Sequence, residues 1–99
     1  MSIEEFRASI ERDAAPPAGA SLALQALWHD ARGDWDRAHN CAQDEPGAGG
    51  SWVHAYLHRK EGDLGNAGYW YSRAGRRAPP PGTTLAAEWE QLARTLLER

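Results

Sequence analysis

Residues 54–76, HAYLHRKEGDLGNAGYWYSRAGR, hold the pattern that decides the fold. Gly62 and Asp63 stand at its centre, between two segments whose apolar residues recur at helical spacing. Glycine readily takes the left-handed conformation that ends a helix, and an aspartate side chain accepts hydrogen bonds from the free amides of the next helix. The stretch is therefore predicted to be part of a hairpin of two helices, over about residues 51–61 and 64–75.

The same pattern occurs earlier in the chain, at a spacing of 29 residues. The corresponding residues are Ala26, His29, Gly33, Asp34 and Ala38 in the first unit, and Ala55, His58, Gly62, Asp63 and Ala67 in the second. A fixed period of this size is typical of stacked helical hairpins, because one hairpin cannot bury its own apolar face and the next one covers it. The sequence thus predicts a first hairpin with helices over about residues 21–32 and 34–43.

The N-terminal part of the chain carries further signals for helix starts. Ser2 and Glu5 have the spacing of a capping box, which predicts a helix over about residues 3–13. Residues 44–50 are rich in glycine and polar residues, so we predict a loop there. Ser51 is then expected to cap the helix that follows this loop.

The composition favours helices throughout. Alanine and leucine dominate the apolar residues and β-branched residues are few, which argues against a sheet. We predict an all-α protein with a single domain, residues 1–99, in which two antiparallel helical hairpins are flanked by an N-terminal and a C-terminal helix. The predicted repeat units cover about residues 20–46 and 50–77, and a proline-rich linker separates them from a capping helix over about residues 83–98.

The second hairpin resembles a tetratricopeptide repeat. The residues that carry the resemblance are Ala55, Gly62, Asp63, Ala67, Tyr71 and Ala74. The period is shorter than the roughly 34 residues of that family, and His29 and His58 stand where the family usually has an aromatic residue. Residues 54–76 are also similar to stretches of small bacterial proteins of unassigned function. The repeat resemblance implies a scaffold whose first helices line a concave surface that holds a peptide or a partner protein.

The expected contact surface of the second hairpin is aromatic and cationic. Its residues are Trp52, Tyr56, Arg59 and Lys60, with Arg73, Arg76 and Arg77 as an outer rim. Because cationic side chains form strong hydrogen bonds with carboxylates, the expected partner is a protein with an acidic peptide or a C-terminal carboxylate. The predicted function is a non-enzymatic interaction scaffold or adaptor, and a homodimer would cover the apolar ends of so short an array. The alternative is that the last helix, through Trp89 and Leu92, folds across this surface.

Three histidines give a rival hypothesis. His54 and His58 are four residues apart and share a helix face, while His29 belongs to the preceding hairpin. Three imidazoles can bind zinc or another transition metal, and the protein would then bind a metal or a small molecule between its hairpins. However, the pair lacks the intervening glutamate of the HExxH motif. The opposing interpretation is that these histidines fill the space between helices, with no cofactor, and a third interpretation is a structural subunit of a larger complex.

Other classes of function have little support in the sequence. The net charge is −3 with both signs interspersed, which disfavours nucleic-acid binding. No apolar run is long enough to cross a membrane and no signal peptide begins the chain, so we expect a cytoplasmic protein without membrane contact. Cys41 aligns with Trp70 and is interpreted as a small buried residue rather than a nucleophile. The glycines of residues 62–68 lack the lysine of a phosphate-binding loop.

Overall fold

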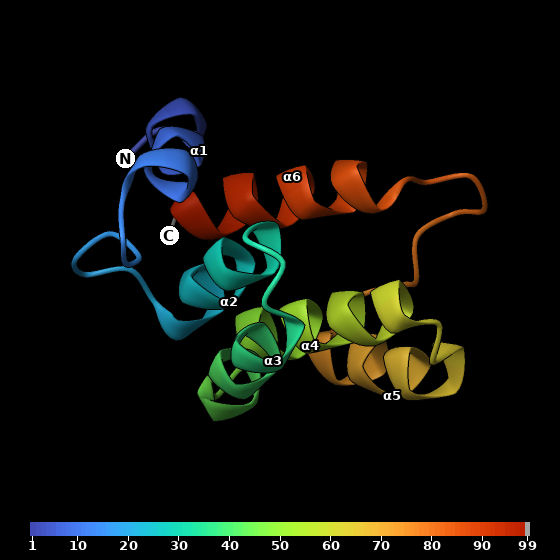
Figure 1. Cartoon of the computed structure of the whole chain (residues 1–99). Helices are drawn as coiled ribbons and strands as arrows, with labels where there is room; N and C mark the ends of the chain where they lie inside the picture. The colour runs from blue at the N-terminus through green and yellow to red at the C-terminus, as the bar shows by residue number, and fades with distance from the viewer. Residues whose placement is uncertain (99) are drawn as a thin grey trace.

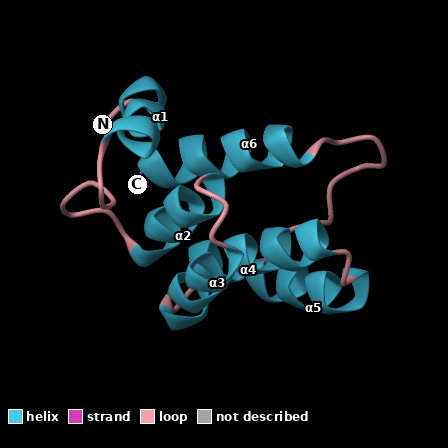
Figure 2. Cartoon of the chain, in the orientation of Figure 1, coloured by secondary structure: helices cyan, strands magenta, loops and turns pink. Residues whose placement is uncertain are grey.

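The computed structural model describes residues 1–98, which fold into six helices and no strand (Figure 2). The helices are α1 (Ile3–Arg12), α2 (Leu22–Ala31), α3 (Trp35–Asp44), α4 (Ala48–Glu61), α5 (Leu64–Ala74) and α6 (Leu85–Leu97). These six helices confirm the all-α prediction. None of them combines the length and the apolar character that crossing a bilayer requires.

Two turns of the same construction build the middle of the molecule. Gly33 and Gly62 take positive φ angles of 81° and 89°, which end α2 and α4. The amides of Asp34 and Asp63 donate to the carbonyl groups five residues earlier, at 3.0 and 2.9 Å. Each aspartate side chain also accepts a hydrogen bond from the amide three residues ahead, at 3.1 and 3.2 Å. This combination of a left-handed glycine and a capping aspartate closes both predicted hairpins.

The two hairpins pack side by side, and α6 lies across them (Figure 1). The helix α3 packs against both α2 and α4, so the first hairpin meets the second through α3 and α4. The helix α6 contacts α2 and α4, which are the first helices of the two hairpins, and α1 packs against α6. Leu27, Leu57 and Leu92 are fully buried in the core that these helices enclose.

The start of α4 differs from the prediction. The loop ends earlier than expected, because α4 begins at Ala48 with Gly47 as its N-cap, and Ser51 lies inside the helix. Gly50 explains the difference, since a Cβ atom at this position would collide with the carbonyl oxygen of Glu45 and lie 2.7 Å from its Cβ. A glycine here allows the first turn of α4 to pack directly against Glu45, the first residue of the preceding loop.

The segment between α5 and α6, residues 75–84, arches from one helix to the other and is called the strap here (Figure 1). At its start Gly75 has a φ of 70°, and the amide of Arg76 donates to the carbonyl of Tyr71 at 3.0 Å. At its end the Thr84 hydroxyl accepts a hydrogen bond from the amide of Ala87 at 3.0 Å. Both ends of the strap are thus fixed by helix caps, and three prolines restrict the backbone between them.

Candidate functional site

The aromatic residues expected to contact a partner lie inside the protein. Trp52 and Tyr56 are only 3% and 2% exposed, because α6 covers the face of α4 that carries them. Trp89 and Leu92 of α6 belong to the same core. Of the two arrangements considered from the sequence, the structure therefore has the one in which the last helix folds across the surface.

A buried carboxylate of α6 engages three side chains of the second hairpin. Glu88 is 2% exposed and accepts hydrogen bonds from the Trp52 indole at 3.3 Å, the Tyr71 hydroxyl at 2.6 Å and the Arg59 guanidinium at 2.9 Å. Arg59 also donates to the carbonyl of Thr83 in the strap. Burial, followed by the hydrogen bond to Glu88, raises the pKa of the Tyr71 hydroxyl, so Tyr71 stays a donor. The carboxylate that Arg59 was expected to bind in a partner is here supplied by the chain itself.

A second buried carboxylate lies on α2. Asp30 is 4% exposed and accepts hydrogen bonds from the Tyr56 hydroxyl at 2.9 Å and the Lys60 ammonium at 2.8 Å. Burial is the first cause, and Asp30 the next, of a raised pKa at Tyr56. Lys60 is therefore also engaged within the molecule, together with Trp52, Tyr56 and Arg59.

The three arginines expected as an outer rim are exposed and have no such partner. Within residues 1–98, no carboxylate lies within ion-pair distance of Arg73, Arg76 or Arg77. The Arg76 guanidinium instead stacks on the indole of Trp52, with its carbon 3.5 Å from the ring centroid. Arg73 lies over the ring of Tyr69 at 5.8 Å, near the surface of α5. Arg73 and Arg76 are thus held against aromatic rings, and all three arginines face solvent.

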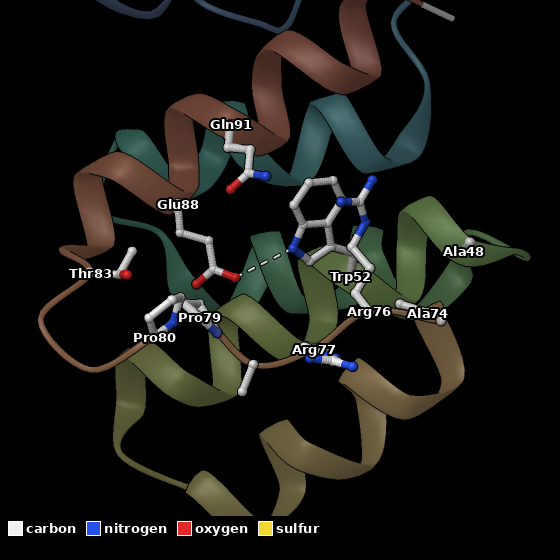
Figure 3. Close-up of a pocket in the computed structure, with 12 residues that line it drawn as sticks. Ala48, Trp52, Ala74, Arg76, Arg77, Pro79, Pro80, Thr83, Glu88 and Gln91 are labelled. Carbon is white, nitrogen blue, oxygen red and sulfur yellow. Dashed lines mark hydrogen bonds between the residues drawn. The ribbon is translucent and has the colours of Figure 1, made fainter.

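A cavity of about 610 Å³ opens beside Arg76 and Arg77 (Figure 3). Its walls come from the first half of α4, the strap and α6, and we call it the strap pocket. The side chains that line it include Trp52, Arg76, Arg77, Pro79, Thr83 and Gln91. Glu88 forms part of the inner wall, where the ion pair with Arg59 offsets its charge. The strap pocket therefore combines an apolar wall with two cations that lack an acidic partner in the described chain.

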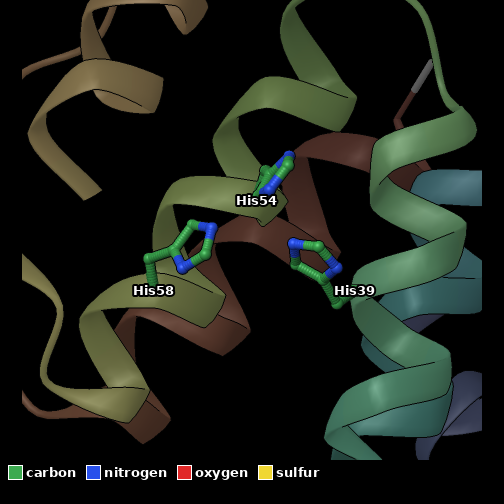
Figure 4. Close-up of side chains that lie close together, drawn as sticks. All are labelled: His39, His54 and His58. Carbon is green, nitrogen blue, oxygen red and sulfur yellow. The ribbon is translucent and has the colours of Figure 1, made fainter. Parts of the chain in front are cut away.

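A separate cluster of three imidazoles lies between the hairpins (Figure 4). His54 and His58 come from adjacent turns of α4, and His39 comes from α3. The ring centroids are 4.5 Å apart for His39 and His54, 5.3 Å for His39 and His58, and 4.8 Å for His54 and His58. One ring nitrogen from each histidine lies within 4.8 Å of the other two. His54 and His58 are buried and His39 is half-buried, so this group, which we call the histidine cluster, sits just beneath the surface.

Neighbouring side chains hold the rings of the histidine cluster in place. Nδ1 of His58 lies 2.7 Å from a carboxylate oxygen of Glu61. The His54 ring stacks on Trp70 with a centroid distance of 3.9 Å. Burial, and then the nearby imidazoles of His39 and His58, lower the pKa of His54 to about 4. At neutral pH this imidazole is therefore uncharged, the form in which histidine binds metals.

The predicted set of histidines is wrong in one member. His29 lies outside the cluster, stacked edge-on against Trp28, and His39 takes the place that was expected for it. The reason is the stacking order, because α3 is the helix of the first hairpin that packs closely on α4. The position of His39 could have been inferred from its spacing, because it follows Trp35 by four residues and so shares a helix face with it. In the structure the two rings stack with a centroid distance of 4.9 Å.

Two other features singled out in the sequence do not form a site with neighbouring groups. Cys41 is half-buried, and burial followed by the nearby Asp44 raises the pKa of its thiol, which opposes nucleophilic reactivity. Gly65 and Gly68 lie on the exposed side of α5, where an added Cβ would meet nothing within 4 Å. Neither glycine is therefore needed for the close approach of another helix.

The sequence and the fold were compared with known proteins. No family model matches the chain, and neither the curated proteins nor the solved structures contain a match.

Proposed function

We propose that the protein is a non-enzymatic interaction module, which binds an acidic segment of a partner protein in the strap pocket. The observation that carries this proposal is the pair Arg76 and Arg77, two exposed cations that have no acidic partner within residues 1–98 and that border a cavity of about 610 Å³. A guanidinium group binds a carboxylate through two parallel hydrogen bonds, so this pair suits an acidic ligand. Self-association stays a prediction.

The chain's own contacts support this choice of ligand. Arg59, which belongs to the same face of α4 as Trp52, is already paired with the carboxylate of Glu88. Arg76 is stacked on the Trp52 ring and has no acidic partner within residues 1–98. Because cation–π stacking leaves the N–H groups at the edge of the guanidinium free, Arg76 can stack on Trp52 and still bind a carboxylate.

Another cavity, of about 530 Å³, fits an acidic partner less well. It lies between α1, α4 and α6, and its two cations are Arg7 and Lys60. Arg7 pairs with Glu90 and Lys60 with Asp30, so their charges are already compensated. Charge complementarity therefore favours the strap pocket.

The resemblance to tetratricopeptide repeats supports an interaction role but assigns a different surface. In such repeats the first helices of successive hairpins line the surface that holds the partner. Here α6 occupies the corresponding face of α2 and α4, and its Glu88 satisfies Arg59. We therefore place partner binding at the edge of this covered face, where the strap passes over Trp52.

Binding of short fluorescent peptides, followed by anisotropy, tests the proposal. We expect a glutamate-rich peptide with a free C-terminal carboxylate to bind saturably, and a matched glutamine peptide with an amidated end to bind far more weakly. The double variant R76Q/R77Q should lower the affinity by about tenfold or more, because hydrogen bonds to charged groups contribute roughly 1.5–3 kcal/mol each. Added salt should also weaken binding.

The matched control is Arg12→Gln, which removes an exposed arginine of α1 that lies outside the strap pocket. R12Q changes the net charge by the same amount as the single variants R76Q and R77Q, each of which should weaken binding of the acidic peptide. R12Q itself should bind this peptide like the wild type. Equal losses in R12Q and R76Q would mean that only the overall charge matters, and the strap pocket would then have no role. Unchanged binding in R76Q/R77Q would contradict the proposal directly.

A further inference from the structure

The histidine cluster has the composition and placement of a metal site. Its three members converge from two helices, with one nitrogen from each within 4.8 Å of the others (Figure 4). In a tetrahedral zinc site the metal–nitrogen bonds are about 2.0–2.1 Å long. The ligand nitrogens of such a site therefore lie closer together than the 4.8 Å limit found here. Binding of a metal would therefore require the three imidazoles to turn towards one another, until each nitrogen is at bonding distance from the metal.

The ring nitrogens of the cluster are short of protein partners. Among the described residues, neither His39 nor His54 forms a hydrogen bond through a ring nitrogen, although His54 is only 4% exposed. Within residues 1–98, every side-chain nitrogen or oxygen that is completely enclosed has a hydrogen-bond partner, so the unpartnered nitrogens of these two rings keep some access to the surface. Histidines that only fill space between helices usually satisfy a ring nitrogen with a backbone or carboxylate group. Here, instead, a ring nitrogen of each of these two histidines lies within 4.8 Å of the other and of a ring nitrogen of His58.

Glu61 provides the carboxylate that commonly accepts a hydrogen bond from a metal-binding histidine, at the ring nitrogen that does not bind the metal. The Nδ1–H group of His58 donates to the Glu61 carboxylate at 2.7 Å, which leaves Nε2 as the nitrogen with a free lone pair. A carboxylate in this position fixes the tautomer and the orientation of the ring, and it makes the imidazole a better ligand.

Two indole rings orient His54 and His39, the other two members of the histidine cluster. Trp70 stacks on His54 with an angle of 14° between the ring planes, and Trp35 stacks on His39 with an angle of 12°. The indole nitrogen of Trp35 in turn donates to the carbonyl of Leu57 at 3.0 Å, which fixes Trp35 to α4. The cluster is thus ordered by its surroundings rather than by hydrogen bonds among the imidazoles.

From these contacts we propose that His39, His54 and His58 bind a divalent transition-metal ion, Zn²⁺ in the first instance, with Glu61 as the residue that positions His58. Three neutral nitrogen ligands suit Zn²⁺ and its neighbours in the transition series, while Mg²⁺ and Ca²⁺ prefer oxygen ligands. A site with three protein ligands leaves a fourth position for water or for a ligand atom from another molecule. This proposal does not depend on the strap pocket, which shares no lining residue with the cluster.

Calorimetric titration of the chelator-treated protein with Zn²⁺ tests the proposal. We expect a single saturable site per chain in the wild type. For Glu61→Gln we expect the affinity to fall by about 10–100-fold, as is usual for a residue that hydrogen-bonds to a metal ligand. His39→Gln removes a ligand itself and should reduce the affinity by more. His29→Gln is the matched control, because it removes a buried histidine outside the cluster, and it should bind Zn²⁺ like the wild type.

Imidazole ¹⁵N resonances of the unmodified chain give a second measurement that does not depend on the folding of any variant. On addition of Zn²⁺ the ring nitrogens of His39, His54 and His58 should shift strongly, while those of His29 should not. The absence of saturable Zn²⁺ binding by the wild type would overturn the proposal, and so would full binding by H39Q or an equal loss in H29Q. Zn²⁺ binding should persist in R76Q/R77Q, so the failure of this proposal is distinguishable from the failure of the strap-pocket proposal.

Discussion

At the scale of single residues, the interior is organised by two carboxylates. Asp30 and Glu88 are both almost completely buried, and all but one of the side-chain donors around them were expected on a partner surface. The exception is Tyr71, which donates to Glu88. A buried charge is costly unless it is paired and hydrogen-bonded, and both carboxylates meet that requirement. The aromatic and cationic residues of α4 therefore bind carboxylates, as their chemistry suggests, but those carboxylates belong to the same chain.

Replacement of Glu88 by alanine should destabilise the protein strongly. The change leaves the Arg59 charge, which is mostly buried, without its partner and removes the acceptor of the Tyr71 hydroxyl. We expect a loss of about 3–5 kcal/mol in the free energy of unfolding, measured by urea denaturation. Glu90→Ala is the control, because Glu90 forms ion pairs at the surface, and it should cost less than about 1 kcal/mol. Similar losses in the two variants would contradict this role of Glu88.

A pH dependence follows from the burial of His54. Its pKa is about 4 in the folded chain and 6.5 ordinarily, so between these values the unfolded chain binds a proton that the folded chain does not. The stability of the chelator-treated protein is therefore complete above pH 6.5 and is lost progressively as the pH falls towards about 4. The loss should amount to roughly 3 kcal/mol in urea denaturation across this range.

The variant His54→Asn isolates this contribution, since asparagine does not titrate. Its free energy of unfolding should depend less steeply on pH than that of the wild type between pH 6.5 and about 4. An identical slope in both proteins would show that His54 is not the group responsible.

At the scale of helices, glycines have opposite roles in α4 and α5. Gly50 lies where α4 packs against Glu45, and a side chain there would collide with backbone atoms. Gly68 lies in the middle of α5 with its free side towards solvent. The two glycines therefore differ in whether the fold requires them, although both are in helices.

Glycine-to-alanine substitutions should separate these roles. Gly68→Ala is expected to stabilise the protein by about 0.5–1 kcal/mol, because alanine loses less conformational freedom in a helix and meets no neighbour. Gly50→Ala is expected to destabilise it by about 1–3 kcal/mol, because Glu45 and the first turn of α4 must move apart. Thermal unfolding followed by circular dichroism measures both changes, and a stabilising Gly50→Ala would contradict the packing described here.

At the scale of the whole molecule, the features that can be predicted from the sequence are those that depend on residues close together along the chain. The hairpins follow from glycine–aspartate turns that act over a few residues, and their geometry is the same in both units. The docking of α6 depends instead on contacts between distant parts of the chain, such as the hydrogen bond between Trp52 and Glu88, which are 36 residues apart. The strap pocket depends on this docking and on the path of the strap, so the arginines were predicted but the cavity beside them was not.

The position of α6 also determines which surface the proposed function assigns to a partner. It closes the face of α2 and α4 that a helical repeat would present, and it forms one wall of the strap pocket (Figure 3). Arg76 and Arg77 are left at the border of that covered face with their charges uncompensated within residues 1–98. The proposed binding site is therefore the charged strap pocket and not an open groove on α2 and α4.

The most direct test of this account is an NMR titration of the ¹⁵N-labelled protein with the glutamate-rich peptide. We predict that the largest shifts occur at the Trp52 indole N–H, at the Nε–H groups of Arg76 and Arg77, and at the backbone amides of the strap, and that they saturate together. Shifts centred on α2 and α3, or no saturable shifts at all, would contradict the claim that the strap pocket is the binding site.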